Sequence, residues 1–342
     1  MRILNLDAPF LAQGFTKLGH EVFRAGHDTG ADLIVSHPRG ALQVYNEVCA
    51  TGFIPDIAFW CDGSNLPYFP GVEELPCPTA FYSIDTYCHP WHCGFANAFD
   101  AVFVAQKDHV PLFPTDSVTV RWLPLFASNL AEEIPWEERD IPVSFVGTRK
   151  HPNNPDREGF LQGFRRYAPL MLHTGEFEAV FSRSRIVLNQ TACSEVNFRC
   201  FEAMACGAAL LTEKCQHGME ELFTPGETIL PVYTRNDSLQ AAAVTKESLS
   251  WEEELREIAH NGRRHVAQNH MVQNRAAVVM EVMEELLREG AVRKRAGELR
   301  QRKEFIAASY GMLGHDLIGR LDPAYSEYYF SVFSSMKESN AS

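Results

Sequence analysis

The sequence predicts an α/β protein made of two successive units, each with its own parallel sheet. Three observations lead to this prediction. Short apolar runs alternate with helical stretches in two series, 342 residues suit about two domains, and a stretch rich in proline and glutamate, 123–140, separates the series. We therefore expect an N-terminal domain at 1–138, a second domain at 139–290, and a helical extension at 291–342 that packs back on the body.

The first series consists of short buried strands that each end at a polar position. Since ligands bind beyond the carboxyl ends of parallel strands, the polar residues that follow the strands are candidates for function. A helix is expected at 11–19, where Gly19 suits a helix C-terminus. The expected strands are 1–6, 21–25, 32–36, 54–60, 79–84 and 101–105.

After the linker, the second series again alternates short strands with helices. Its strands are expected at 141–146, 185–189 and 208–212, and its helices at 157–168 and 198–206. From Ser250 onward the spacing of apolar residues is helical. These C-terminal helices are also a candidate surface for homo-oligomerisation.

The extension begins with a basic stretch that we interpret as a solvated helix face, because Glu298 interrupts it. The aromatic segment 325–333 is expected to pack back on the body. The basic residues are Arg293, Lys294, Arg295, Arg300, Arg302 and Lys303.

Composition fits a globular protein of the cytoplasm. Hydrophobic residues make up 45% and charged residues 22% of the chain. No apolar run reaches the ~18 residues that a membrane span needs, and the N-terminus becomes polar too early for a signal peptide. The nine cysteines are odd in number and scattered, which does not fit a disulfide framework.

The net charge of −13 is unevenly distributed. Residues 1–140 contain 7 basic and 18 acidic side chains, so this half is a poor platform for polyphosphate and no nucleic-acid partner is expected. Residues 149–199 contain 8 basic and 5 acidic side chains. An anionic ligand is therefore expected there.

The most informative block is 184–233. Arg199 and Glu202 stand three apart at the start of a helix and share one face, and helix N-termini suit phosphate. An arginine adds a forked cationic donor, and a glutamate one turn further can accept both hydroxyls of a ribose. Gly207 closes the helix, and Gly218 lies in a loop at the end of the next strand. One diphosphate and one diol fit this arrangement.

This block resembles the C-terminal half of CgeB-like, spore-maturation type glycosyltransferases and, more loosely, the large retaining group with a Glu-Ala-Met-Ala signature, here 202–205. The resemblance covers 140–285, and the first half only by architecture. It implies the GT-B fold: two Rossmann-like domains whose parallel sheets face a cleft, plus C-terminal helices. It also implies a nucleoside-diphosphate sugar as donor, no further cofactor and no catalytic metal.

Carried over residue by residue, the resemblance makes Glu202 the ribose ligand and Arg199 a phosphate ligand. One departure concerns the second glutamate that the wider group places eight residues earlier, near the transferred sugar; position 194 is Ser, and Glu195 is one residue away. The expected donor site comprises Gly147, Thr148, Arg157, Asn189, Asn197, Arg199, Glu202, His217, Gly218 and Met219.

The first half offers candidates for a general base. Asp85 directly follows an expected strand and is our first candidate, and His89 is the second. Asp7 is a third, although a helix-capping role fits it better. A zinc site made of Cys88, His89, His92 and Cys93 is disfavoured, because neighbouring Cys-His pairs strain to point at one ion.

The function predicted from the sequence is sugar transfer from a nucleoside-diphosphate sugar to an unidentified acceptor. A GT-B sugar-nucleotide epimerase and a non-catalytic nucleotide-sugar-binding or assembly protein stay open as alternatives. The sequence contains no Gly-x-Gly-x-x-Gly after a strand, no phosphate loop of the Gly-Lys-Ser/Thr type and no Gly-x-Ser-x-Gly turn. Dinucleotide dehydrogenases are therefore disfavoured.

Overall fold

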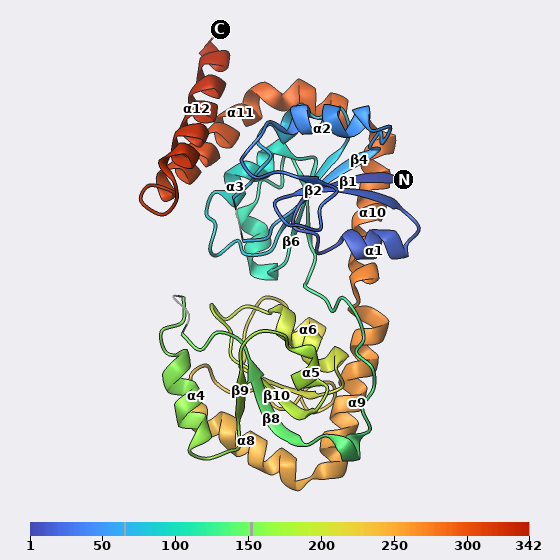
Figure 1. Ribbon diagram of the computed structural model, residues 1–342, viewed down its shortest axis with the longest axis vertical. Helices are drawn as coiled ribbons and strands as arrows, with labels where there is room; N and C mark the ends of the chain where they lie inside the picture. The colour runs from blue at the N-terminus through green and yellow to red at the C-terminus, as the bar shows by residue number, and fades with distance from the viewer. Residues whose placement is uncertain (65, 151–152, 342) are drawn as a thin grey trace. The chain divides into compact units, whose positions relative to one another are not determined.

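The computed structural model describes residues 1–64, 66–150 and 153–341 and divides the chain into two compact units (Figure 1). The first unit combines Met1–Leu123 with Arg275–Ser342, and the second is Pro124–Asn274. These bounds differ from the expected 1–138 and 139–290. The linker lies with the second unit because Ala127 exchanges backbone hydrogen bonds with His270 and Val272, each 2.9 Å long.

The first unit is built on a seven-stranded parallel sheet in the order β3-β2-β1-β4-β5-β6-β7. The central strands are buried on both faces, as expected for a sheet with helices on each side. β7 was not predicted from the sequence. The strands are β1 (Arg2–Asp7), β2 (Glu21–Gly26), β3 (Leu33–Ile34), β4 (Ile57–Cys61), β5 (Thr79–Ser83), β6 (Ala101–Val104) and β7 (Thr119–Trp122).

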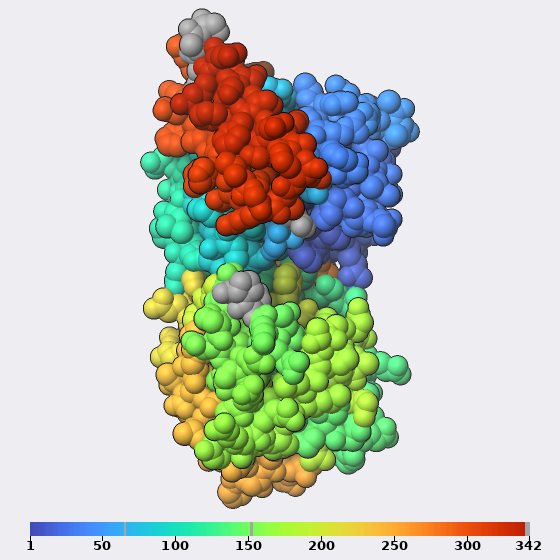
Figure 2. Space-filling model, turned by 60° about the vertical axis from the view of Figure 1, so that its left-hand side comes forward, coloured from blue at the N-terminus to red at the C-terminus, as the bar shows by residue number. Residues whose placement is uncertain are grey.

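The helices of this unit come from both ends of the chain. α1 (Ala12–Lys17), α2 (Ala41–Ala50) and α3 (His92–Phe95) connect strands, whereas α10 (Val272–Glu289), α11 (Ala291–Asp316) and α12 (Pro323–Ala341) return to it. α11 packs against α3 and α12. In Figure 2 the red C-terminal helices lie against the blue-to-cyan surface of the first unit.

Two arginines of the basic stretch in α11 depart from the predicted solvated face, whereas Arg293, Lys294 and Arg300 are exposed as expected. Arg295 is 1% exposed and Arg302 is 3% exposed. The Arg295 guanidinium forms an ion pair with Asp100 and donates to the backbone carbonyls of Glu73 (3.1 Å) and Cys77 (3.1 Å). These arginines therefore anchor α11 to the first unit, because a buried guanidinium needs partners for its N–H groups.

The second unit contains a four-stranded parallel sheet in the order β11-β10-β8-β9. β9 was not predicted from the sequence. The strands are β8 (Ile141–Val146), β9 (Met171–His173), β10 (Ser184–Asn189) and β11 (Ala209–Thr212), and the helices are α4 (Arg157–Arg165), α5 (Glu178–Phe181), α6 (Phe198–Ala205), α7 (Met219–Leu222), α8 (Ser238–Ser250) and α9 (Glu252–Asn269).

The turn from α6 into β11 has a local cause in the sequence. Gly207 has a φ of +75°, the left-handed conformation that commonly ends helices. A Cβ on this residue would lie 2.6 Å from the Arg139 guanidinium. A larger residue is therefore disfavoured both by the backbone conformation and by this close contact. The helix thus stops at a fixed point and the chain re-enters the sheet as β11.

Two further properties concern the whole chain. Within the described ranges, no helix combines the length and apolarity needed to cross a membrane. All nine cysteines are free thiols.

Candidate functional site

The carboxyl ends of β8 and β10 bring together several of the predicted donor-site residues. Arg199 lies in the first turn of α6. Its Nε donates to the carbonyl of Val146 (3.1 Å), at the end of β8, and its Nη1 donates to Oδ1 of Asn189 (2.7 Å), at the end of β10. Asn197, the N-cap of α6, donates to the same Asn189 oxygen (3.2 Å). The first turn of α6 is therefore fastened to the edge of the sheet.

The glycine that follows β8 makes room for this arginine. Gly147 has a φ of +151°, and a Cβ at this position would lie 2.6 Å from Nη2 of Arg199. The Arg199 guanidinium also lies over the ring of Phe145, 4.7 Å from its centroid. Any larger residue at 147 would displace the arginine from the sheet edge.

Arg157 approaches the same edge from α4. It is 4% exposed, and its guanidinium donates to Oε1 of Gln190 (3.0 Å), to the backbone carbonyl of Gln190 (3.1 Å) and to that of Thr148 (3.0 Å). It lies 5.9 Å from the centroid of the Phe145 ring. Burial lowers the pKa of Arg157, and the charge of Arg199 lowers it further.

These two arginines share an electrostatic property that points to a ligand. All of their hydrogen-bond partners are neutral oxygens, and no carboxylate of the described residues lies within 4.0 Å of either guanidinium. Arginine stays charged at all ordinary pH values. A buried and a half-buried cation that are hydrogen-bonded only to neutral oxygens form a site that favours an anion with several oxygens.

Glu202 lies one turn beyond Arg199 on α6. Burial raises the pKa of its carboxyl to about 7, and Arg199 is close enough for its charge to lower that pKa. Glu202 forms no hydrogen bond to Arg199 among the described contacts. Its side chain lines a pocket of about 200 Å³ that lies wholly in the second unit. The pocket is lined by Ala127, Ser128, Asn129, Ala131, Phe177, Glu178, Glu202, Ala205 and Cys206.

His217, Gly218 and Met219 lie in the turn that follows β11 and begins α7. His217 and Gly218 both have a positive φ, +60° and +82°, and Met219 is buried, with its sulfur 3.4 Å from Sγ of Cys215. The backbone here is thus tightly wound at the carboxyl end of a strand. This is where a loop that approaches a ligand is expected.

The side chain of Glu195 stabilises the loop before α6. Its carboxylate accepts from the backbone N–H of Ala192 (3.0 Å) and from that of Cys193. Ser194, at the position where the wider group has glutamate, has a φ of +64° and accepts from Arg235 through Oγ (2.9 Å). The Glu195 carboxylate therefore faces its own loop.

The sequence did not predict the ion pair between Glu213 and Arg235 that stabilises this loop. Glu213 is fully buried after β11, and its Oε1 accepts from Arg235 (2.8 Å) and from the backbone N–H of Thr191 (3.0 Å). Nη1 of Arg235 also donates to Oγ1 of Thr191 (3.0 Å). Glu213 directly follows β11, which is a signal that could have identified it; nothing local marked Arg235.

In the first unit, Asp85 lies beyond the end of β5 in a network of hydroxyl donors. Its Oδ1 accepts from the Tyr87 hydroxyl (3.0 Å) and its Oδ2 from Oγ of Ser64. Burial raises the pKa of Asp85, and the nearby charge of Asp62 raises it further. An aspartate with a raised pKa that stays partly exposed is suited to accept a proton.

Asp62 holds the loop around Asp85 in place through backbone hydrogen bonds. It is fully buried at the end of β4 and accepts from the backbone N–H groups of Ser64 (2.8 Å), Ile84 (3.1 Å) and Asp85 (2.8 Å). The third candidate, Asp7, accepts from Nε1 of Trp60 through Oδ2 and is likewise buried. It caps no helix, since α1 begins at Ala12 with Leu11 as its N-cap.

The histidines of the 85–93 loop pack together. The ring of His89, the second base candidate, lies 5.5 Å from that of Trp91 and 5.0 Å from that of His92. His92 is fully buried and its Nδ1 lies 2.9 Å from Oγ of Ser83. Over the part of the chain that the structure covers, no three His, Cys, Asp or Glu side chains are arranged to hold a metal ion. The alternative zinc set, Cys88, His89, His92 and Cys93, therefore does not converge on one point.

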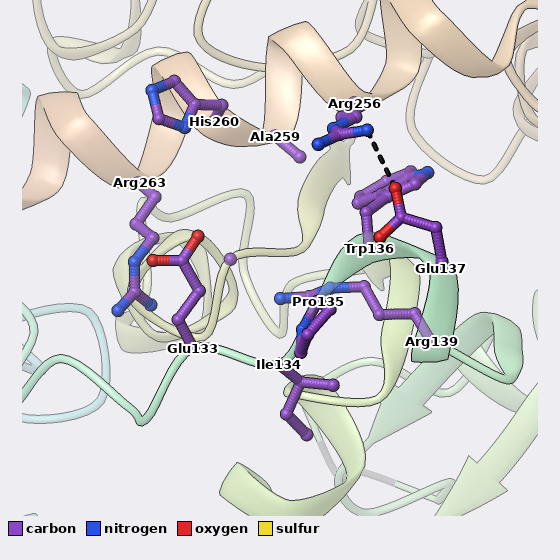
Figure 3. A pocket seen from close by; sticks show the side chains of 11 residues that line it. Glu133, Ile134, Pro135, Trp136, Glu137, Arg139, Arg256, Ala259, His260 and Arg263 are labelled. Atoms are coloured by element: carbon purple, nitrogen blue, oxygen red, sulfur yellow. Dashed lines mark hydrogen bonds and ion pairs between the residues drawn. The ribbon is translucent and has the colours of Figure 1, made fainter.

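A second pocket of the second unit, about 190 Å³ in volume, contains three arginines but differs from the site at the sheet edge (Figure 3). Arg139 donates to the carbonyls of Ser184 (2.8 Å) and Cys206 (3.0 Å), Arg263 donates to those of Ala205 and Ala131, and Arg256 forms an ion pair with Glu137. Two of these carbonyls belong to the C-terminal end of α6. These arginines thus cap a helix and hold the linker.

With this geometry in place, comparisons with known proteins identify the type of fold. Residues 129–281 match the model of a family described as glycosyl transferase-like. Among solved structures, HepE from Anabaena, in complex with UDP and glucose, is 14% identical with a TM-score of 0.64 over 84% of this chain and 100% of that chain.

A sucrose-phosphate synthase from Thermosynechococcus elongatus is 11% identical with a TM-score of 0.60, and a glycosyltransferase from Rickettsia africae is 10% identical with a TM-score of 0.59. Each covers 84% of this chain, and 100% and 98% of the respective structures. No curated protein matches the chain by sequence. The predicted fold class is confirmed: the chain has the α/β fold with two parallel sheets that these GT-B proteins share.

Proposed function

We propose that the protein is a glycosyltransferase that moves a sugar from a nucleoside-diphosphate donor to an acceptor. One observation carries the proposal: the buried Arg157 and the half-buried Arg199 meet at the carboxyl edge of the second sheet, and their hydrogen bonds go only to neutral oxygens. A diphosphate supplies the missing negative charge. The glycosyl transferase-like match over the same unit and the fold support this assignment.

In the proposed donor complex, Arg199, Arg157 and backbone N–H groups near Gly147 and Gly218 hold the diphosphate. Glu202 accepts from the ribose hydroxyls. Asn189 and Asn197 orient Arg199, as they already do through their side chains. Thr148, His217 and Met219 complete the walls, at the ends of β8 and β11.

The bond between the anomeric carbon and the phosphate oxygen breaks, and its electron pair leaves with the nucleoside diphosphate. The arginines stabilise the charge that develops on this leaving group. An acceptor oxygen forms the new bond to the anomeric carbon and gives up its proton to Asp85, with His89 as the second candidate base. No step uses a metal ion, since the arginines stabilise the leaving group.

Two finer assignments belong to the proposal. The resemblance of the block 184–233 to the CgeB-like proteins supports membership of that subgroup. The nine free thiols support a cytoplasmic location.

The test incubates the purified protein with a panel of sugar nucleotides and measures release of nucleoside diphosphate, with and without candidate acceptors. A transferase leaks sugar slowly to water, and an acceptor accelerates the release. An epimerase instead converts the donor to an isomer and releases no diphosphate. A binding protein gives neither product. Absence of release with every donor, alongside measurable donor binding, would refute transfer.

A further inference from the structure

Asp62 joins two loops at the carboxyl edge of the first sheet, one that follows β4 and one that follows β5. Its Oδ2 accepts from the backbone N–H groups of Ile84 (3.1 Å) and Asp85 (2.8 Å). Its Oδ1 accepts from the backbone N–H of Ser64 (2.8 Å). Asp62 is fully buried, and a buried N–H group that loses its acceptor costs free energy. The position of the Asp85 backbone is therefore set by Asp62.

The same carboxylate also places a hydroxyl group that binds Asp85. The hydrogen bond from Ser64 to Asp62 spans two residues and forms an Asx turn. This turn holds Ser64 at a φ of +56°, a left-handed conformation that is unfavourable for a residue with a Cβ. Here Oγ of Ser64 donates to Oδ2 of Asp85, and the Tyr87 hydroxyl donates to Oδ1 (3.0 Å). Both oxygens of Asp85 are thus oriented by fixed neighbours.

Asp62 brings a charge close to Asp85 as well. Three N–H donors favour the ionised form of a carboxylate, and none of its described hydrogen-bond partners can accept a proton. Nε2 of His92 lies 4.0 Å from Oδ2 of Asp62, but burial lowers the pKa of His92 well below its usual range, so this ring does not neutralise the carboxylate. Burial raises the pKa of Asp85, the charge of Asp62 raises it further, and the hydrogen bond from Ser64 lowers it.

Other titratable groups face these two aspartates, and they stay in place when residue 62 or 64 is replaced. A difference between variants at these positions therefore reports on Asp62 and Ser64 themselves. The other groups are Tyr82, Tyr87 and His89 around Asp85, and Asp7, Cys61, Tyr82, His89 and His92 around Asp62.

We propose that Asp62 positions the base Asp85, directly through the backbone and indirectly through the Ser64 hydroxyl. The inference rests on the proposed function, because it takes Asp85 as the base in sugar transfer. A general base must lie within hydrogen-bond reach of the proton that it accepts, and a small misplacement of a reacting group lowers the rate strongly. Asp62 and Ser64 act through Asp85 and are positioning residues.

The pH dependence of donor hydrolysis tests this role. The full chain is incubated with the panel of sugar nucleotides, UDP-glucose and GDP-mannose among them, with water as acceptor, and the release of nucleoside diphosphate is measured against pH. D62N keeps one oxygen but removes the charge. Its rate should fall about 10- to 100-fold. The acidic limb of its pH profile should move to lower pH, because the loss of a like charge lowers the pKa of Asp85.

The second variant, S64A, is expected to shift the profile in the opposite direction. It removes a hydrogen-bond donor to the Asp85 carboxylate, so the acidic limb should move to higher pH. D116N, at an exposed aspartate of the same unit, removes one charge elsewhere and should keep the wild-type profile. Donor affinity, measured by calorimetry, should be unchanged in all three variants, because the proposed donor residues belong to the second unit.

The opposite shifts distinguish positioning from a general structural defect, which lowers the rate without moving the limb. An acidic limb that stays at the wild-type pH in either variant, or that moves in the same direction in both, would overturn the inference and leave sugar transfer standing. If D62N shows no cooperative melting transition, S64A decides, because Ser64 is exposed and belongs to the same series of contacts. If the wild type hydrolyses no donor, the proposed function fails and the inference fails with it.

Discussion

Replacement of Arg199 by methionine probes the donor site most directly. Methionine keeps an unbranched, apolar side chain that can still lie over the Phe145 ring, but it removes the charge and every N–H donor. The geometry around Arg199 is set by Gly147 and Asn189. Neither depends on the presence of a ligand. The variant therefore isolates what the guanidinium does for a bound anion.

The size of the effect follows from counting donors. A guanidinium has five N–H groups, and in Arg199 one points to the Val146 carbonyl and one to Asn189. Three remain for a ligand. If one or two of these reach phosphate oxygens, their loss costs about 2–4 kcal/mol, which is roughly a 30- to 700-fold rise in Kd. A nucleoside without phosphates should bind unchanged.

Calorimetry with nucleoside diphosphates and with nucleosides provides the measurement. R166M, at an exposed arginine of the same unit, removes one charge elsewhere and is the matched control. Thermal melts should show that apo R199M stays folded. Equal losses for nucleoside and nucleoside diphosphate would mean that the arginine supports the fold of the site and not the phosphates, and this would refute the reasoning.

Three further predictions concern other parts of the chain. Burial raises the pKa of Glu202 from 4.5 to about 7, so the folded state binds this proton more tightly than the unfolded state does. As the pH rises from about 4.5 to 7, the melting temperature of the wild type should therefore fall relative to that of E202Q, and above pH 7 the two curves of melting temperature against pH should run parallel. Curves that are parallel over the whole range would contradict a raised pKa of the carboxyl. Asp85→Asn should suppress transfer and leave donor binding intact, whereas exposed D116N should retain activity; an active D85N would assign the base elsewhere. Arg295→Met leaves Asp100 buried without its ion-pair partner and should lower the free energy of unfolding, measured with denaturant, by about 3–5 kcal/mol. R300M, at an exposed position of α11, should change it little. Equal unfolding curves for the two variants would show that the ion pair contributes nothing to stability.

The sequence predicts the apolar strands better than the short strands with polar residues, for a physical reason. β1, β5, β6, β8, β10 and β11 each contain consecutive buried apolar residues because both faces of these strands are covered. β7 and β9 lie at sheet edges and contain charged or polar residues, so their four- and three-residue segments gave no apolar run to detect. β4 begins at Ile57, not at Ile54, whose side chain is 61% exposed.

The same distinction applies to the candidate site. The place of Arg199 at the start of a helix that follows a strand was predicted from rules about strand ends and helix starts, which act locally. Asp62, Glu213 and Arg235 depend on partners twenty or more residues away, and a sequence without its fold does not specify such pairs. The burial of Arg295 in α11 was not predicted for this reason, since Arg295 meets Asp100 across 195 positions.

The separation of Arg199 and Glu202 on α6 is itself an argument for a nucleotide. Three residues advance about 4.5 Å along a helix axis, a length comparable to that between a diphosphate and the hydroxyls of the attached ribose. An ion pair between the two side chains would neutralise both, yet Arg199 is drawn to Val146 and Asn189, while Glu202 lines the pocket with Ala205. The sheet edge therefore keeps the cation and the carboxylate apart. Both groups are partly buried and neither forms a hydrogen bond to the other, so a nucleoside diphosphate can engage both at once.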